Sequence, residues 1–426
     1  MAYPSTGQQR LSYDACLQQA RQHNVQLKQA LLDLEIASVR LKTRRAERLP
    51  VVNGTLRNNN SVGRSVDPLT NEFIDRKFSS LNGAVNSSIY VFEGFKTASE
   101  IKAARQEINQ QTSQLQALEN DIAVDLALAY IRINYLLEIC KSQQQQLTLS
   151  TRLIELTRLK LSAGRVAESA LFKLLSQQAT EQLNLTKSQN DLRLAYLDLR
   201  QIMNAQPNDT FQILPLQYPV AAEAEFAPPT GPEVSRAVEA QPALAAKQYS
   251  ALRVRHQIGV ARADLYPSLQ LTGSLGSNYS NTNQAYDFAR QLNTNRSYGV
   301  GFVLAVPLFN SFRYKLLIKE SRLEYQRELL AVDQERNRLN KVVQQAITDA
   351  QAASQSWKSA VQAEEFARKS YEADQLKYEL GTISVFELNQ AKATYVSAQA
   401  DLFKAKYESI LRSRLVGFYQ GTPLTL

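Results

Sequence analysis

The sequence has very few of the residues from which metal sites, disulfide frameworks and catalytic centres are built. Among its 426 residues are two cysteines and two histidines. We expect Cys16 and Cys140, which lie far apart in helical surroundings, to be free thiols that are buried or half-buried. No metal-ligand spacing, phosphate-binding loop or nucleophile motif is present. The sequence therefore disfavours an enzyme, and we expect no catalytic residue, no metal and no cofactor.

The sequence also lacks long apolar stretches. No run of about 18 apolar residues occurs, which excludes a transmembrane helix. The first residues, Met1-Ala2-Tyr3-Pro4, show neither the charged region nor the apolar core of a signal peptide. We therefore expect either a cytosolic protein or a mature form whose signal has been removed. The repeat and strand patterns described below favour the second.

Glycine and proline, which interrupt helices, are scarce, with 15 and 13 residues respectively. Ala, Leu, Gln, Glu, Lys and Arg fill most of the chain, and these residues lose least free energy on entering a helix. A mainly α-helical fold follows. The net charge is +9, but the cations are interleaved with acidic residues, as in Glu320-Ser321-Arg322-Leu323-Glu324, and form no dense basic block. Nucleic acid is therefore not an expected partner.

An internal duplication is the most informative feature of the sequence. A shift of 217 positions, the difference between Gly164 and Gly381, aligns the two halves without a gap. Other aligned pairs are Ala20 with Ala237, Leu27 with Leu244, Pro50 with Pro267, Phe92 with Phe309, Phe95 with Phe312, Ala129 with Ala346 and Leu171 with Leu388. We expect a first structural repeat over residues 1–205, a Pro-rich linker over 206–231, a second repeat over 232–421 and a tail over 422–426.

Both repeats predict the same order of helices. A first helix, over residues 12–48 or 232–265, stops before a proline, because proline pushes the preceding residue out of the α region. After a pair of strands comes a long helix, over 95–161 or 312–380. The chain then reverses at a glycine turn, and a return helix runs to about residue 204 or 418.

The predicted strands alternate in character along their length. They lie near residues 50–60, 82–92, 267–277 and 297–308, with polar loops over 58–80 and 277–296. Val300, Phe302, Leu304, Val306 and Leu308 share one face, and strands of about ten residues cross a bilayer when tilted. Because open sheet edges are not tolerated in lipid, we expect several identical chains to close one barrel. These five side chains would then face lipid.

Small residues recur along the long helices, among them Ala123, Ala127, Ala346 and Ala350. Together with apolar stripes flanked by polar residues, they suit antiparallel coiled-coil packing. For the helices alone, a soluble spectrin-like bundle fits equally well. A periplasmic adaptor is a further alternative, although it needs a single helical hairpin flanked by lipoyl-like segments. Four strands at duplicated positions favour a membrane protein over both.

An ordered set of motifs over nearly the whole chain resembles the TolC family of outer-membrane efflux proteins. In the first copy these are the Ala-x-x-x-Asn-x-x-Leu pattern from Ala20 to Leu27, Leu49-Pro50 and Val91-Phe92-Glu93-Gly94-Phe95. In the second they are Pro307-Leu308-Phe309-Asn310-Ser311-Phe312 and Tyr378-Glu379-Leu380-Gly381-Thr382. The segment Gly63-Arg64-Ser65-Val66-Asp67-Pro68 is similar to versions found in Bacteroidetes. Each motif alone is weak, and the order of the set gives it specificity.

This resemblance implies a fold, a location and partners. The fold would be a homotrimer in which four strands per chain form a 12-stranded outer-membrane β-barrel. Long coiled helices would form an α-barrel that extends through the periplasm. The protein would be a passive exit duct of a tripartite efflux or type I secretion system, and would catalyse nothing. Its partners would be outer-membrane lipid, a periplasmic adaptor and an inner-membrane pump of the RND or ABC type.

The resemblance also carries residues over to the two helical turns. The periplasmic entrance lies at these tips, so the expected adaptor contacts are Ala163, Gly164, Arg165, Leu380, Gly381 and Thr382. Each tight reversal also needs a residue that adopts left-handed backbone angles, which by itself explains both glycines.

The family places two acidic residues one helical turn apart inside the entrance, where they form charged rings in the trimer. These positions correspond here to Glu387 and Gln390, of which only Glu387 is acidic. Three carboxylates around one axis would attract cations. Without the resemblance, a solvated helix face is the simpler interpretation of Glu387. The family's closing latch is preserved in part by Tyr378 and Ser169. Ile383 and Ala170 replace its other two members, and Glu168 or Arg165 are candidate substitutes.

Overall fold

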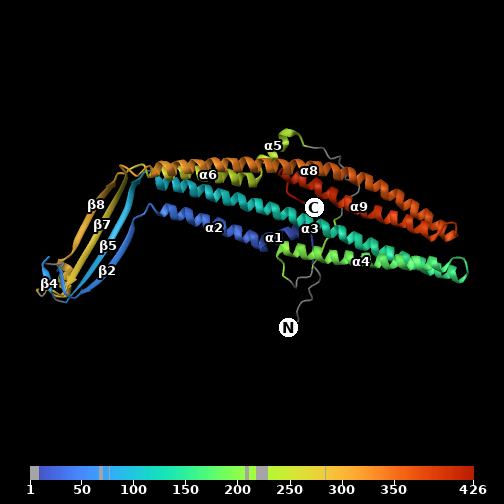
Figure 1. Cartoon of the computed structure of the whole chain (residues 1–426), viewed down its shortest axis with the longest axis horizontal. Coiled ribbons are helices and arrows are strands. Elements are labelled where there is room, and N and C mark those ends of the chain that lie inside the picture. The colour runs from blue at the N-terminus through green and yellow to red at the C-terminus, as the bar shows by residue number, and fades with distance from the viewer. Residues whose placement is uncertain (1–8, 67–70, 76, 207–210, 217–228, 284) are drawn as a thin grey trace. The chain divides into compact units, whose positions relative to one another are not determined.

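The computed structural model describes residues 9–66, 71–75, 77–206, 211–216, 229–283 and 285–426. In this part of the chain, helices and strands follow each other in two similar series (Figure 1). The first series is β1 (Gln9–Leu11), α1 (Tyr13–His23), α2 (Val25–Ala46), β2 (Val51–Ser61), β3 (Arg64–Val66), β4 (Phe73–Asp75), β5 (Phe78–Glu93), α3 (Lys96–Ser162), α4 (Glu168–Met203) and β6 (Phe211–Ile213). The second is α5 (Gly231–Glu239), α6 (Pro242–Ala263), β7 (Ser268–Ser280), α7 (Phe288–Thr294), β8 (Ser297–Ala305), α8 (Arg313–Leu380) and α9 (Val385–Tyr419).

The two series repeat the same boundaries along the chain. The pairs α2 and α6, β2 and β7, α3 and α8, and α4 and α9 each begin 217 residues apart. Unusual backbone angles recur at the same offset. Phe95 has a φ of 64° and Phe312 a φ of 63°, and Asn204 and Gly421 have φ values of 49° and 99°. Because side chains rarely adopt positive φ, this recurrence shows that the duplication extends to the backbone.

The corner between β5 and α3 requires glycine at one position. Gly94 has a φ of +64°, and a Cβ there would lie 2.4 Å from the backbone oxygen of Ala263 on α6. The equivalent residue of the second copy, Ser311, keeps a positive φ of 55°. The positive φ alone therefore does not require glycine, but the close approach of α6 at Gly94 does.

The first helix of each copy is divided, which the sequence pattern does not predict. Instead of one helix over 12–48, α1 ends and α2 begins on either side of Asn24, whose ψ is 126°. The Asn24 side chain compensates for the lost helical bonds. Its Nδ2 donates to the Ile202 backbone oxygen at 2.9 Å, and its Oδ1 accepts from the Gln26 N–H at 2.8 Å. The expected helix over 232–265 is likewise divided between α5 and α6.

The segments expected to be polar loops contain regular structure. β3 and β4 pair with each other within residues 58–80, and α7 lies within residues 277–296. The strand expected at 82–92 begins earlier, at Phe78, because its first residues pair with the end of β2. Asp67 and Pro68, the first four residues, and residues 207–210 and 217–228 of the Pro-rich linker lie outside the described residues.

The chain divides into two compact units, and each takes residues from both copies. Unit 1 comprises Met1–Leu32, Ser113–Ala245 and Asp333–Leu426, and unit 2 comprises Asp33–Thr112 and Ala246–Val332. The long helices α3 and α8 contribute residues to both units. Among the described helices, none is both long and apolar enough to cross a membrane.

The core of unit 1 forms where α1, α3, α4 and α9 pack together. Tyr130 of α3 is buried there, and its hydroxyl donates to the backbone oxygens of Leu214 at 2.7 Å and Leu11 at 3.2 Å. These bonds tie the core to the parallel pair of short strands β1 and β6. Cys16 is buried in the same core, Cys140 is half-buried, and both are free. The expectation for the two thiols is confirmed.

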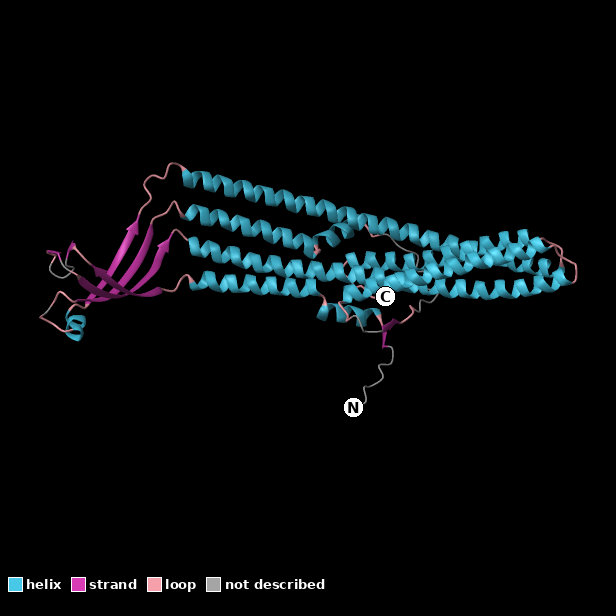
Figure 2. Cartoon of the chain, turned by 60° about the horizontal axis from the view of Figure 1, so that its bottom comes forward, coloured by secondary structure: helices cyan, strands magenta, loops and turns pink. Residues whose placement is uncertain are grey.

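Unit 2 contains a four-stranded antiparallel sheet with the strand order β2–β5–β7–β8, drawn in magenta in Figure 2. Strands adjacent in this order are antiparallel, with one irregularity in β5 between Tyr90 and Phe92. Within the described chain, β2 and β8 pair on one side only, so each leaves an edge open. Because directly paired residues share a face, the register assigns every strand side chain to one face or the other.

Candidate functional site

One face of the sheet in unit 2 is apolar and exposed. Phe302 of β8 pairs with Leu271 of β7, which pairs with Ile89 of β5, so the three share a face. Two neighbours of Phe302, at Val300 and Leu304, lie on the same face. The exposed fractions are 83% for Val300, 69% for Phe302 and 64% for Leu304. Leaving such side chains in water costs free energy, so this face requires an apolar environment.

The opposite face of the sheet is polar. Asn53 of β2 pairs with Asn86 of β5, which pairs with Ser274 of β7. The pairs Arg57 with Asn82 and Asn82 with Asn278 continue this face. Strands with an apolar face outside and a polar face inside are typical of transmembrane barrels that enclose water.

The last strand is shorter than the sequence predicts. Pairing of β8 with β7 ends at Ala305, although the strand was expected to run to residue 308. Pro307 follows, and proline cannot donate to a strand ladder. Val306 and Leu308 are exposed but lie beyond the strand, so the alternation of the sheet does not fix their direction.

The two helical turns of unit 1 share one geometry. Gly164 between α3 and α4 has a φ of +66°, and Gly381 between α8 and α9 has a φ of +80°. In the first turn the Arg165 N–H donates to the Lys160 oxygen at 2.9 Å, and in the second the Thr382 N–H donates to the Lys377 oxygen at 2.9 Å. A Cβ at either glycine would meet no atom within 4 Å. The glycines therefore serve the backbone angle and not close packing.

Both turns are fully available at the surface of the chain. Ala163, Gly164 and Arg165 are exposed, and so are Gly381 and Thr382. The side chain of Leu380 is 72% exposed. Single exposed apolar side chains such as this one are common on any protein surface.

Glu387 closes the first turn of α9. Its carboxylate accepts from the Ser384 N–H at 2.8 Å and from the Ser384 hydroxyl at 3.0 Å, while its own N–H donates to that hydroxyl at 3.3 Å. This capping box satisfies two N–H groups at the helix start. The hydrogen bonds from Ser384 lower the pKa of Glu387, so the exposed carboxylate is charged at neutral pH. Gln390, one helical turn further on, is also exposed.

Tyr378 of α8 is buried against the first hairpin. Its hydroxyl lies 2.9 Å from the Thr157 hydroxyl of α3. The Lys160 ammonium donates to the Tyr378 backbone oxygen at 2.7 Å and lies 4.5 Å from the centre of the Tyr378 ring. Within one chain, the two hairpins are thus joined close to their tips by a tyrosine, a threonine and a lysine.

The other latch candidates lie elsewhere. Arg165, Glu168 and Ser169 are all exposed around the start of α4, and the partner of the Tyr378 hydroxyl is Thr157. Sequence comparison could not single out Thr157, because it lies on the ascending helix, twelve residues before Ser169.

A buried ion pair joins three helices of unit 1. Lys392 of α9 is 3% exposed, and its ammonium lies 2.7 Å from the Glu181 carboxylate of α4. The Ser150 hydroxyl of α3 accepts from Lys392 and donates to Glu181 at 2.6 Å. Gln177 adds a further hydrogen bond to Glu181 at 3.1 Å. Each charge therefore has both a counter-charge and hydrogen bonds, which a buried ion requires.

The ion pair breaks the symmetry of the duplication. Shifted by 217 positions, Lys392 falls on Leu175, and Glu181 falls on Ala398. Lys392 follows Val385 and Leu388, both buried, at helical spacing. A lysine within that apolar stripe indicates a buried charge from the sequence alone. The sequence pattern does not identify Glu181 as its partner.

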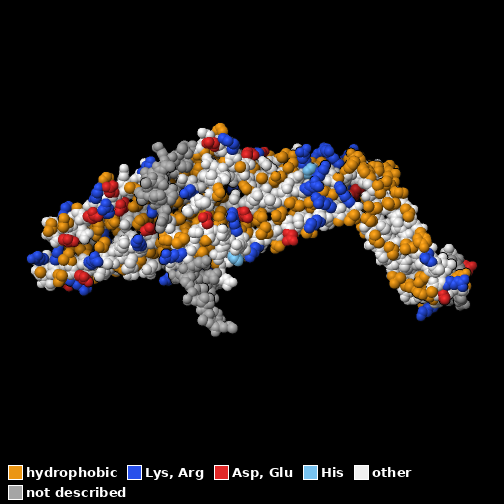
Figure 3. All heavy atoms as spheres, turned by 180° about the vertical axis from the view of Figure 1, so that it is seen from behind, with side chains coloured by type: hydrophobic (Ala, Val, Ile, Leu, Met, Phe, Trp, Pro, Cys, Tyr) orange, Lys and Arg blue, Asp and Glu red, His pale blue; other side chains and the backbone are white. Residues whose placement is uncertain are grey.

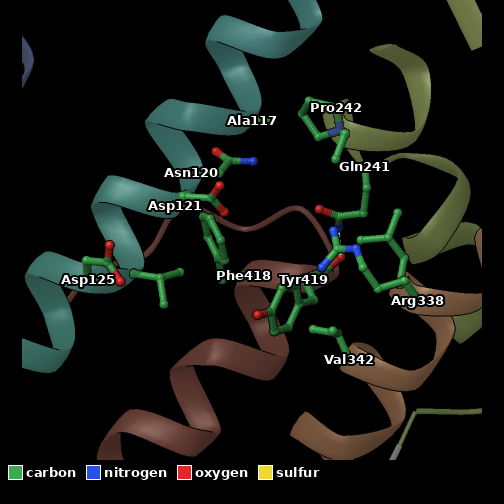
Figure 4. Close-up of a pocket in the computed structure, with 13 residues that line it drawn as sticks. Ala117, Asn120, Asp121, Asp125, Gln241, Pro242, Arg338, Val342, Phe418 and Tyr419 are labelled. Carbon is green, nitrogen blue, oxygen red and sulfur yellow. Dashed lines mark hydrogen bonds between the residues drawn. The ribbon is translucent and has the colours of Figure 1, made fainter. Parts of the chain in front are cut away.

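A cavity of about 340 Å³ opens among α3, α6, α8 and α9 in unit 1 (Figure 4). Asn120, Asp121 and Asp125 of α3 lie on one side, and Tyr419 and Arg338 lie on the other. Burial raises the pKa of Asp121, and the neighbouring Asp125 carboxylate adds to the effect. No cluster of three or more potential metal-ligating side chains occurs among the described residues.

An exposed apolar sheet face, open sheet edges and paired helical hairpins define a subunit of a membrane channel. The sequence of this chain matches a family model described as outer membrane efflux protein over residues 16–205 and 234–413. Because these matches cover most of the chain, the protein belongs to the outer membrane efflux protein family. The TolC-family resemblance and the mainly helical fold with two tandem repeats are confirmed.

Individual relatives are distant in sequence but close in fold. Outer membrane efflux protein BepC of Brucella suis is 18% identical over 330 residues, which cover 76% of this chain and 68% of BepC. A crystal structure of CusC is 16% identical with a TM-score of 0.84, covering 99% of this chain and 95% of CusC. That of VceC from Vibrio cholerae is 16% identical with a TM-score of 0.83, covering 97% and 96%.

Family membership fixes the class of function. The protein is an outer-membrane efflux channel subunit with periplasmic helices, and it is not an enzyme. Channels of this family are trimers that work with an adaptor and an inner-membrane pump. The soluble bundle, the adaptor and the enzyme considered from sequence are therefore excluded.

Proposed function

We propose that three copies of this chain close one 12-stranded barrel by pairing β8 of each chain with β2 of the next. The observation that carries this proposal is the combination of two open edges with an exposed apolar face. In lipid, each backbone N–H or C=O group left without a hydrogen bond at a strand edge costs roughly several kcal/mol. Closure of the sheet into a barrel is therefore strongly favoured. The strands of both repeats (1–205 and 232–421) would then build the barrel, with Val300, Phe302 and Leu304 towards lipid.

The helical tips are the proposed periplasmic entrance of the duct. Ala163, Gly164, Arg165, Leu380, Gly381 and Thr382 would contact the adaptor. Exposure of both turns supports this, because adaptor docking needs accessible backbone and side chains. The pump behind the adaptor would be of the RND or ABC type. Substrates would pass through the duct passively, driven by that pump.

Tyr378, Thr157 and Lys160 are the proposed tip latch of this chain. Their contacts hold the second hairpin against the first, so they favour a closed tip. Arg165, Glu168 and Ser169 remain candidates for contacts between neighbouring chains, because their side chains are exposed in the single chain.

The oligomer and its conductance test the duct. The detergent-purified protein is expected to have the mass of three 47.9-kDa chains by native mass spectrometry, and to form discrete channels in a planar bilayer. A stable monomer that inserts no channels would exclude the proposal. Channels formed by another number of chains would keep the duct but exclude the 12-stranded barrel.

Glu387 is proposed to form a charged ring inside the entrance. Replacing it with glutamine keeps a capping-box residue and removes the charge. We expect the permeability ratio of cations to anions to fall towards one, because three carboxylates around the pore would attract cations. Single-channel reversal potentials in a salt gradient measure this ratio. Glu379→Gln, which removes a neighbouring exposed carboxylate from α8, is the matched control, and an equal effect of both variants would contradict the ring.

A further inference from the structure

The excess positive charge of the protein lies entirely in unit 2. Residues 33–112 and 246–332 contain 23 Lys and Arg against 14 Asp and Glu, a net charge of +9, whereas the rest of the chain contains 26 of each kind. The segments next to the sheet, residues 33–50, 93–112, 246–267 and 309–332, contain 17 cations and 10 anions, or +7. Figure 3 shows Lys and Arg side chains gathered over the helices that adjoin a largely hydrophobic sheet.

Many of these cations are not neutralised by neighbours. Six of them define the basic collar: Arg45, Arg48, Arg262, Arg313, Lys315 and Lys319. All six are exposed, and none forms an ion pair within the part of the chain that the structure describes. Three carboxylates in the same segments are already engaged, since Arg44 pairs with Glu47 and Glu100, and Arg40 pairs with Glu107. The collar therefore presents free positive charge.

All four connections between sheet and helices carry an exposed apolar residue, and in three of them a cation adjoins it directly. The exposed residues are Leu49 (64%) before β2, Phe95 (67%) after β5, Tyr266 (52%) before β7, and Phe309 (76%) and Phe312 (60%) after β8. Arg48, Lys96 and Arg313 directly adjoin Leu49, Phe95 and Phe312, whereas Arg262 lies four residues from Tyr266 with Asp264 between them. Aromatic residues followed by Lys and Arg mark the boundary between hydrocarbon and water in membrane proteins.

We propose that the basic collar binds the phosphate groups of anionic phospholipids at the periplasmic surface of the outer membrane. The proposal rests on the proposed barrel, because it requires the sheet to lie in lipid. Arg48 precedes β2 by three residues and Arg262 precedes β7 by six. The intervening residues are mostly non-helical and span at most about 3.5 Å each, so Arg48 lies within roughly 10 Å and Arg262 within roughly 20 Å of the strand ends. Long arginine side chains extend this reach.

The distribution of the collar favours a lipid surface over a single soluble anion. A soluble anion is held by donors that converge on one enclosed point, whereas the collar cations are exposed and come from three separate segments. Guanidinium groups bind phosphate oxygens through two parallel hydrogen bonds, so Arg45, Arg48, Arg262 and Arg313 suit headgroups spread over a surface.

Lipid selectivity tests the collar. The full-length wild type is reconstituted in an equimolar mixture of phosphatidylcholine and phosphatidylglycerol, and the lipids that stay bound are counted by native mass spectrometry. The collar variant combines Arg45→Gln, Arg48→Gln, Arg262→Gln and Arg313→Gln. Its enrichment of phosphatidylglycerol over phosphatidylcholine is expected to fall by about fivefold or more. Fivefold corresponds to the usual attraction of a single surface cation to anionic lipid, and the variant removes four cations per chain.

Two matched variants separate the collar from charge in general. Arg152→Gln, Arg158→Gln, Lys187→Gln and Arg193→Gln together remove the same charge from exposed helix positions of unit 1 and should leave the enrichment unchanged. Lysine at the four collar positions should largely keep it. Single-channel conductance in phosphatidylcholine alone verifies that each variant has folded.

Three results would overturn the proposal. The first is a wild type that conducts but shows no preference for phosphatidylglycerol, which leaves the barrel intact. The second is an equal loss in the unit 1 control. The third is displacement of phosphatidylglycerol by an equal concentration of inorganic phosphate, which would indicate a free-anion site. Absence of wild-type channels in either lipid would instead overturn the barrel and the collar together.

Discussion

Replacing Lys392 with methionine is expected to destabilise the protein by about 3–5 kcal/mol per chain, because the buried Glu181 carboxylate loses its counter-charge. The Ser150 hydroxyl and the Gln177 amide would remain as hydrogen-bond donors to that carboxylate. They cannot replace a full positive charge in a site that water does not reach. Thermal or urea unfolding of the purified protein, followed by the helical circular dichroism signal, measures the loss.

Two further variants test whether the loss comes from the ion pair. Lys404→Met removes an exposed lysine from the same helix and should change stability by less than about 0.5 kcal/mol. Combining Lys392→Met with Glu181→Leu should recover much of the loss, because apolar residues can replace a buried pair at little cost. If the double variant is as unstable as the sum of the two single variants, the coupling between Lys392 and Glu181 is absent.

Replacing Phe302 with arginine is expected to cost about 2–4 kcal/mol per chain in a bilayer, the usual penalty for a cation on the lipid face near the midplane. With three chains in the proposed barrel, the penalty would be incurred three times. Folding of the denatured protein into lipid vesicles, followed through the fraction that resists urea, should therefore fall sharply.

The neighbouring residue provides the control for this prediction. Val303 is also exposed but lies on the opposite, polar face, where it pairs with Gln270. Val303→Arg adds the same charge to the same strand and should fold nearly as well as the wild type, since the lumen accommodates charge. Equal damage from both variants, or greater damage from Val303→Arg, would contradict the assignment of the faces.

The local elements of this protein were largely readable from its sequence. Prolines at 50 and 267 marked helix ends to within four residues, since α2 ends at Ala46 and α6 at Ala263. Glycines at 164 and 381 reverse the chain, because glycine readily adopts positive φ. Alternation along 300–304 assigned one face of β8 correctly as apolar. The same reasoning extended the strand to residue 308, since alternation alone does not reveal where ladder pairing stops.

Errors arose where a side chain far along the chain decides the local backbone. Asn24 lies inside a pattern that predicts one continuous helix. Its side chain instead binds the Ile202 backbone oxygen from α4 and ends α1 one residue earlier. Glu387 shows the complementary case, because the capping box with Ser384 gives it a local structural role that family comparison does not assign.

The sequence by itself determined the duplication, the order of helices and strands, and the family, because periodicity and turn residues act over short distances along the chain. Only the tertiary structure decided which side chains meet. The Lys392–Glu181–Ser150 cluster joins three helices. The hydroxyl of Tyr378 forms its hydrogen bond with Thr157 and not with Ser169. The concentration of the +9 charge in unit 2 also became visible only once residues from both copies were assigned to one unit. Such contacts depend on which helix faces pack together. The internal duplication, with its offset of 217 residues, does not determine which faces these are.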